Sequence, residues 1–431
     1  MIIDFKIRNY RSFKDEVFFS MEAEASKQKP QNFTEINLVN ESQLRLLKIA
    51  VAFGSNASGK SNLIRAFYHL INFIVRKPQV NTKISMYDPF LFDTNTLNAD
   101  AEFELNFIGP DNIRYTYKVV YNGDSVKSEN LNYFPNGKSA NVFARKSSIV
   151  ENSNIDIGVL GPQLGKKEIR VFSNQLLLSK FGDDEPIEQL TNLFLYFKRF
   201  EVINAANFSH KSYIKNQVDI VTNDNKGLFT KLNALIRFAD TKLKGFIIHN
   251  SKDQKILDRN EVRINEKILS PFMLYGLHSI YTNLEDTGEI FNLPFDSEST
   301  GTQVLYSIGG KVLLTLETGG SLIIDELDTS LHPFLTRMIV LMFQSEKLNP
   351  LKAQLIFTTH DMTLLDRDLV RRDQVWITEK NEMGISEIFS LQQFDGVREE
   401  TPFDKWYLAG KFGGLPELKS VDSIFDDASA E

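Results

Sequence analysis

The run Gly54-Ser55-Asn56-Ala57-Ser58-Gly59-Lys60-Ser61 lies between two strongly patterned segments. Before it, residues 46–53 are almost continuously apolar, which is typical of a strand buried on both faces. After it, residues 62–75 place apolar side chains at helical spacing, and Pro78 ends the pattern. A strand, a glycine-rich loop ending in Lys-Ser and a helix form the context that a phosphate-binding loop requires. We therefore predict an α/β fold in which this run binds phosphate groups.

Each constrained position of the run has a chemical reason. Glycines let the backbone approach phosphate oxygens closely, and the amides at the start of the helix attract negative charge. Lys60 can neutralise the β- and γ-phosphates of a nucleotide, and the Ser61 hydroxyl can bind Mg²⁺. The alternative is a structural Gly/Ser-rich turn, which the flanking strand and helix disfavour.

An acidic pair follows a second apolar strand in Leu322-Ile323-Ile324-Asp325-Glu326. The strand would carry Asp325 to the metal, and Glu326 would polarise a water molecule in line with the γ-phosphate. An acidic pair after a strand is commonplace, so its interpretation depends on the motifs that accompany it.

Two further motifs accompany the acidic pair. Ser299 and Gly301 open a predicted helix, whose N-terminus would be a second anion site, separate from the first and suited to a nucleotide held by a partner. Downstream, the strand predicted at 354–357 leads to His360, whose neutral imidazole could contact the γ-phosphate. A lone histidine is more often structural, but here it completes an ordered set.

The rest of the chain shows alternating and helical patterns. The first 19 residues predict a hairpin with its turn near 9–12, and residues 101–149 predict a β-meander. We expect helices at 188–200, 228–243 and 334–343, and short strands at 246–248 and 375–377. The predicted organisation is an N-terminal lobe (1–150), a mainly helical insertion (151–290), a C-terminal lobe (291–416) and an acidic tail (417–431).

Composition limits the class of protein. The 431 residues are 42% hydrophobic and 24% charged, which suffices for a packed core. The absence of cysteine excludes thiolate metal sites, and the lack of a long apolar run or a signal-peptide pattern predicts a cytoplasmic protein without membrane segments. A net charge of −7 argues against a wholly basic surface, so DNA would need a local groove. Candidates for that groove are Arg145-Lys146, Lys166-Lys167 and Arg170.

The order of these motifs resembles ABC-type ATPases of the non-transporter branch, which includes SMC and RecF relatives. Within that branch the chain looks like the RloA-like AAA ATPases of bacterial anti-phage and abortive-infection loci. The resemblance also rests on residues 5–13, Pro89-Phe90, the run from Asp325 to Pro333 and residues 407–416.

The resemblance implies an ABC-type P-loop ATPase with a mixed sheet, an antiparallel β-subdomain and an inserted helical subdomain, using ATP and Mg²⁺. We could not place the glutamine that such ATPases use as a second metal contact, because Gln79 lies in no diagnostic context. By this likeness Lys60 and Ser61 hold phosphate and Mg²⁺, Asp325 supports the metal, Glu326 is the base, His360 is the switch histidine, Asp328 belongs to the loop between them, and Ser299 with Gly301 is donated across a homodimer or higher homo-oligomer.

The resemblance further implies that ATP-dependent dimerisation acts as a sensor or scaffold for a separately encoded effector, often a Toprim-like nuclease such as RloB. The alternative is a RecF- or SMC-like DNA-repair ATPase that binds duplex DNA. A third possibility, a non-catalytic nucleotide-dependent interaction protein, is disfavoured because Glu326 and His360 are both present.

Overall fold

The computed structural model describes residues 1–38, 40–79, 82–146, 155–160, 169–204, 226–240, 242–250, 272–280 and 289–416. The N-terminal elements are β1 (Ile2–Arg8), β2 (Val17–Ser20), β3 (Phe33–Ile36), β4 (Leu44–Leu47), β5 (Ile49–Gly54), α1 (Lys60–Val75), β6 (Ala101–Ile108), β7 (Arg114–Tyr121), β8 (Val126–Tyr133), β9 (Ala140–Arg145) and β10 (Ile155–Asp156). The central elements are α3 (Leu177–Ser179), α4 (Glu188–Phe197), β11 (Glu201–Asn204), α6 (Lys226–Ala239), β12 (Leu243–Asn250), β13 (Phe272–Ile280) and β14 (Glu289–Pro294). The C-terminal elements are α7 (Thr300–Thr318), β15 (Ser321–Asp325), α8 (Pro333–Gln344), β16 (Gln354–Thr358), β17 (Val375–Lys380), β18 (Ser386–Ser390) and α9 (Phe403–Leu408).

The first sheet is antiparallel and has the strand order β10-β9-β8-β7-β6-β1-β2. It contains the predicted N-terminal hairpin and the predicted meander, which β1 joins by pairing with β6. Along β6 the side chains alternate between buried and partly exposed, as the period-2 sequence pattern indicates. The two predicted strand regions are therefore confirmed and form one sheet.

The second sheet carries the predicted phosphate loop and has the order β11-β15-β16-β5-β17-β18. All neighbours are parallel except β17 and β18. Both faces of β5 are covered, because Ala50 and Ala52 belong to one core cluster and Ile49, Val51 and Phe53 to another. The carboxyl ends of the parallel strands meet at one edge, where an α/β sheet characteristically binds its ligand.

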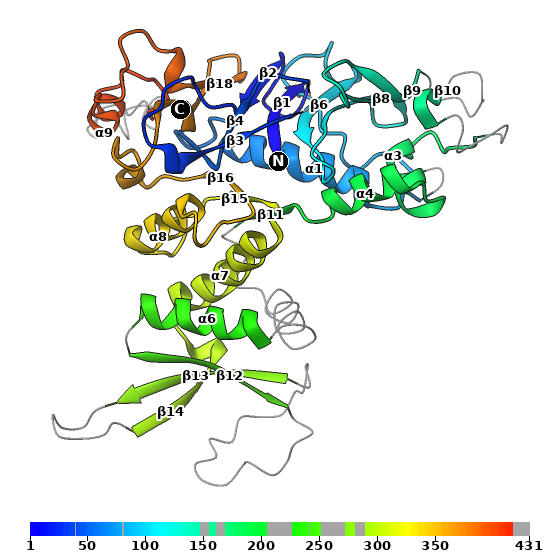
Figure 1. Cartoon of the computed structure of the whole chain (residues 1–431). Coiled ribbons are helices and arrows are strands. Elements are labelled where there is room, and N and C mark those ends of the chain that lie inside the picture. Colours follow the sequence, from blue (N-terminus) through cyan, green and yellow to red (C-terminus); the bar gives the residue numbers. More distant parts are fainter. Residues whose placement is uncertain are drawn as a thin grey trace, which may run out of the picture.

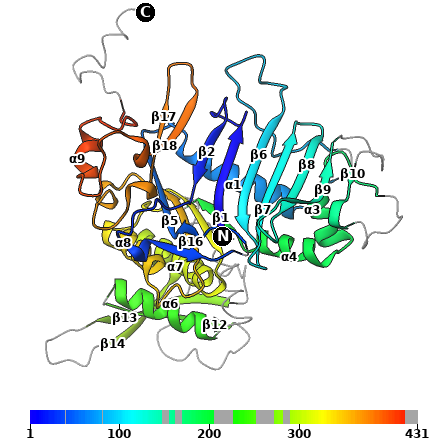
Figure 2. The same cartoon turned by 45° about the horizontal axis from the view of Figure 1, so that its top comes forward.

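Helix α1 lies between the two sheets (Figure 2). The ring of Phe67 packs against Phe5 and Phe19 of the antiparallel sheet, with centroid distances of 4.5 and 6.0 Å. The same cluster includes Ile323 and Ile356 of the parallel sheet. A single amphipathic helix thus fixes the distance between the sheets and the direction of the loop that precedes it.

The apolar run predicted as one strand at 46–53 is two strands in different sheets. Strand β4 pairs with β3, whereas β5 pairs with β16 and β17. The chain changes sheets at the buried Lys48, whose N–H donates to Asn32 O at 2.9 Å and whose carbonyl accepts from Leu355 N at 2.8 Å. These long-range backbone bonds, which hydrophobicity does not reveal, divide the run.

A second body projects from the parallel sheet as an arm (Figure 1). In it the three-stranded antiparallel sheet β12-β13-β14 packs against α6 and α7. Phe246 of β12 meets Tyr306 of α7 at a centroid distance of 4.8 Å. The insertion predicted at 151–290 therefore contains its expected helices α4 and α6 but is not mainly helical in its described part. The sequence pattern indicated only the short strand at 246–248, because the partners of β12 lie far along the chain.

Arg145 does not belong to a surface groove, contrary to the sequence-based expectation. Its side chain is buried, and it donates to Gln175 O at 2.6 Å and to Phe172 O at 3.1 Å. Burial raises the pKa of the nearby Glu129 carboxyl, and the Leu177 N–H and the charge of Arg145 oppose that effect. Lys146 and Arg170 are exposed, whereas residues 166–167 and the tail 417–431 lie outside the described residues.

Within the described part of the chain, every helix is too short or too polar to cross a lipid bilayer.

We predict that Arg145→Met lowers the free energy of unfolding by about 3–5 kcal/mol, because Glu129 stays buried without its cation. Chemical denaturation followed by circular dichroism measures the change. The matched control is Lys146→Met at the exposed neighbour, which should leave stability within about 0.5 kcal/mol. Equal stability of the two variants would contradict the assigned role of Arg145.

Candidate functional site

The glycine-rich loop from 54 to 61 connects β5 to α1 at the carboxyl edge of the parallel sheet. Gly54 and Gly59 have φ angles of 154° and 122°, and Ala57 has a φ of 62°. A Cβ on Gly54 would lie 2.4 Å from Thr378 O, and one on Gly59 would lie 2.8 Å from Ser386 Oγ. Both glycines are thus required by backbone conformation and by close packing.

Lys60 folds back over this loop. Its Nζ donates to Gly54 O at 2.8 Å and to Ser55 O at 2.9 Å. Burial lowers the pKa of the Lys60 amino group, while Asp325 and other nearby carboxylates raise it. The ammonium is therefore held at the mouth of the loop, where a phosphate oxygen could replace either carbonyl as its acceptor.

Asp325 ends β15 and lies under the start of α1 with 3% of its surface exposed. Its Oδ1 accepts hydrogen bonds from Ser61 Oγ at 3.1 Å and Thr358 Oγ1 at 2.7 Å. Its Oδ2 accepts from Asn204 Nδ2 at 3.1 Å. The structure thus brings together Ser61 and Asp325, which the sequence assigned to one metal, and adds two residues that it did not.

The chemistry of this donor set fits Mg²⁺. A hydroxyl, a carboxylate and an amide carbonyl from Asn204 are hard oxygen ligands of the kind that Mg²⁺ prefers. In the described part of the chain no three His, Asp or Glu residues form a complete metal cluster. A magnesium ion at Ser61 and Asp325 would therefore take its remaining ligands from phosphate oxygens and water, as Mg²⁺ commonly does.

Glu326 has a left-handed backbone conformation, with φ of 56°. Its N–H donates to Thr358 Oγ1 at 2.7 Å, and its Oε2 accepts weakly from Thr329 Oγ1 at 3.4 Å. A non-glycine residue in this region costs roughly 1–3 kcal/mol, and such strain is concentrated at functional sites. Its half-buried carboxylate has no strong partner and remains available to orient a water molecule.

The loops after β15 and β16 are tied together by Asp328 and His360. The backbone N–H of His360 donates to Asp328 Oδ2 at 3.2 Å, while Asp328 Oδ1 is buried without a partner among the described residues. The His360 side chain is exposed and forms no hydrogen bond within the described residues. Its ring is therefore free to receive a ligand at the same edge of the sheet.

Ser299 and Gly301 open α7 on the exposed surface. Ser299 Oγ caps the helix by accepting from Thr302 N at 3.2 Å. A Cβ on Gly301 would lie 2.9 Å from Ser330 O, in the loop that follows Glu326. Among the described residues, no hydrogen bond joins Ser299 or Gly301 to the phosphate loop of the same chain. The structure therefore separates these two residues from Lys60 and leaves both regions accessible.

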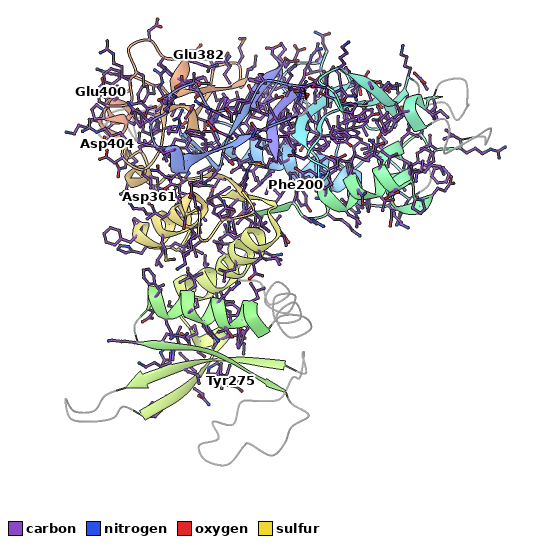
Figure 3. The ribbon with its side chains drawn as sticks, in the orientation of Figure 1. Phe200, Tyr275, Asp361, Glu382, Glu400 and Asp404 are labelled. Atoms are coloured by element: carbon purple, nitrogen blue, oxygen red, sulfur yellow. The ribbon has the colours of Figure 1, made fainter. Side chains whose placement is uncertain are left out.

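The arm is connected to this second anion site by a buried contact. Glu298, immediately before Ser299, is 8% exposed, and its Oε1 lies 2.7 Å from His278 Nε2 on β13. Gly276 leaves room for the Glu298 side chain, since a Cβ there would lie 2.0 Å from Oε1. Figure 3 shows Tyr275 of the same strand in the arm, and Asp361, next to His360, in the main body.

Sequence reasoning missed Asn204, Thr358 and Arg11. The amide sought at Gln79 is instead supplied by Asn204, at the end of the short edge strand β11, whereas Gln79 is exposed and its carbonyl bonds to Asn174. Arg11, placed by the sequence in a hairpin turn, donates to Asn62 Oδ1 at 2.8 Å in the first turn of α1 and pairs with Asp88. A search for any amide after a short β pattern could have found Asn204.

Comparisons with known proteins agree with this geometry in outline. A family model described as an AAA domain, putative AbiEii toxin of a type IV toxin–antitoxin system, matches residues 49–366. No curated protein matches the chain. Among solved structures, the chain is similar to the SMC head domain from Thermotoga maritima at 12% identity and a TM-score of 0.41, covering 90% of this chain and 98% of that one. It is also similar to an SMC head domain from Pyrococcus yayanosii (9% identity, 95% and 99% covered, TM-score 0.41) and to the recombination mediator RecF (12%, 90% and 98%, 0.35).

We predict that Thr358→Val lowers the free energy of unfolding by about 1–3 kcal/mol, because Glu326 N loses its acceptor inside a site of unchanged shape. Thermal and chemical denaturation measure this loss. Thr363→Val, at an exposed threonine beyond the same strand, serves as the control and should be nearly neutral. If both variants were equally stable, Thr358 would not organise the acidic pair.

Proposed function

We propose that this chain, which belongs to the AAA-domain family described as putative AbiEii toxins of type IV toxin–antitoxin systems, binds ATP with Mg²⁺ and hydrolyses it to ADP and phosphate. The observation that carries the proposal is the convergence on Asp325 of hydrogen bonds from Ser61, Thr358 and Asn204. They come from the phosphate-loop helix and from two neighbouring strands. Such a site gathers a phosphate cradle, metal ligands and a base at one sheet edge.

The residues divide the chemistry among them. Lys60 exchanges its carbonyl acceptors for phosphate oxygens, and the loop amides hold the phosphate chain. Ser61 and Asp325 would hold Mg²⁺, which neutralises the developing charge on the phosphates. Glu326, aimed by its left-handed backbone, orients and deprotonates the attacking water, and His360 binds the γ-phosphate that leaves.

We further propose that two copies bind ATP between them. Ser299 and the amides near Gly301 are exposed and separated from the phosphate loop of their own chain, so their anion would come from a second molecule. ATP then favours the paired state because it touches both chains, and hydrolysis removes that differential contact. Asp328 Oδ1, buried without a described partner, lies in the adjacent loop and would face the same interface.

The role of this cycle follows from the arm. Because Glu298 joins β13 to the start of α7, a partner bound to the arm could shift the position of Ser299. This supports an RloA-like sensor or scaffold that controls a separately encoded effector, such as a Toprim-like nuclease, in anti-phage defence. The burial of Arg145 removes one support for the competing DNA-repair role.

The test compares Lys60→Ala and Glu326→Gln. We expect Lys60→Ala to weaken ATP binding at least about tenfold, because charged hydrogen bonds to phosphate are lost. We expect Glu326→Gln to retain binding, to lower turnover by about 100-fold or more and to accumulate ATP-bound dimers. Equilibrium binding, phosphate release and light scattering measure these three properties.

Glu400→Gln, at an exposed carboxylate, is the control and should behave as the wild type in all three assays. A Glu326→Gln protein that stays monomeric when saturated with ATP would contradict the dimer. Unchanged ATP binding by Lys60→Ala would contradict the assigned site itself.

A further inference from the structure

The motif at 407–416 is not used by the phosphate chemistry, yet it packs against the phosphate loop. Tyr407, on α9, donates its hydroxyl to Gly414 O at 3.0 Å, and its ring lies 6.1 Å from that of Phe53 on β5. Phe412, buried between them in the chain, packs against Phe394 at 5.2 Å. These contacts anchor the turn that contains Gly413 and Gly414 to the strand leading into the loop.

The turn comes as close as glycine permits. Gly413 and Gly414 have φ angles of 66° and 67°. A Cβ on Gly414 would lie 2.7 Å from Ile377 Cγ2 and 3.4 Å from Gly54 Cα. The backbone of this turn therefore forms a wall beside the first residue of the phosphate loop, on the flank of β5 where β17 lies.

Glu379 lies on this wall. Its strand neighbour Thr378 pairs with Gly54, and a Cβ on Gly413 would lie 2.7 Å from Glu379 Oε2. Glu379 is exposed, and no donor among the described residues contacts its carboxylate. Glu387 lies directly opposite it on β18 and is exposed as well. Like charges directly opposite each other destabilise a sheet, so this pair is costly unless a ligand supplies donors.

The direction of a bound nucleotide relates this wall to the site. Asp325 and His360 follow β15 and β16, which lie on one flank of β5 in the sheet. The γ-phosphate belongs to that flank, and the phosphates run in line from it through the loop. The group beyond the α-phosphate then leaves on the other flank, where β17 carries Glu379 (Figure 2). The ribose is the part of the nucleotide nearest the α-phosphate.

We propose that Glu379 binds the ribose hydroxyls of the nucleotide, with the Gly413–Gly414 turn as the wall against which the sugar lies. This inference rests on the proposed function and adds the recognition of a ribonucleoside to it. A carboxylate accepts hydrogen bonds from a pair of sugar hydroxyls, which phosphate contacts alone do not recognise. The site therefore selects ribonucleoside triphosphates over deoxyribonucleoside triphosphates.

The test measures dissociation constants of the full chain for ATP, 2′-deoxy-ATP, 3′-deoxy-ATP and inorganic tripolyphosphate. Wild-type protein should bind ATP about 10- to 100-fold more tightly than at least one deoxy analogue, the range for hydrogen bonds to a charged group. Glu379→Ala should reduce that ratio to about one and leave tripolyphosphate binding unchanged. The matched control is Glu382→Ala, at the turn between β17 and β18, which should keep the wild-type ratio (Figure 3).

The outcomes separate this inference from the proposed function. If the wild type binds ATP and both deoxy analogues equally, or if Glu379→Ala keeps the preference, the ribose contact is refuted and the nucleotide site stands. If no triphosphate binds to the folded wild type, both proposals fail. A preference lost equally in Glu382→Ala would also refute the specific role of Glu379.

Discussion

The Asp325 carboxylate is the point at which separate parts of the chain are fixed to one another. Ser61 reaches it from α1, Thr358 from β16 and Asn204 from β11. A nearly buried carboxylate is costly unless hydrogen bonds satisfy it, so these contacts are required for its burial as well as useful for chemistry. Thr358 also accepts the Glu326 N–H, which orients the second acidic residue by the same hydroxyl. Metal position and water position are therefore set by one small network.

Helix α1 transmits this arrangement to the rest of the molecule. One side packs against the antiparallel sheet through Phe67, and the other packs against the parallel sheet. Arg11, in the turn between β1 and β2, contacts Asn62 at the start of the helix. The antiparallel sheet is thus a support for the phosphate loop, and its buried Glu129 and Arg145 stabilise it from within.

The arm and the C-terminal turn approach the site from different sides. The arm reaches it through His278 and Glu298, next to the exposed start of α7. The turn at Gly413 and Gly414 reaches it beside Gly54, on the flank opposite Asp325. In our proposal the first contact would link a partner to dimer formation, and the second would recognise the sugar.

Local sequence determined the elements whose patterns are self-contained. The β-meander, α1, β15 and the glycine-rich loop follow from side-chain periodicity and from the conformations that only glycine adopts readily. Tertiary structure decided everything that depends on the choice of a distant partner. The division of 46–53 at Lys48, the sheet of the arm, the internal role of Arg145, and the positions of Asn204 and Glu379 all arise from long-range pairing. Periodicity shows which side of a segment is buried, but the strand register and hydrogen bonds that bury it come from residues far away in the chain.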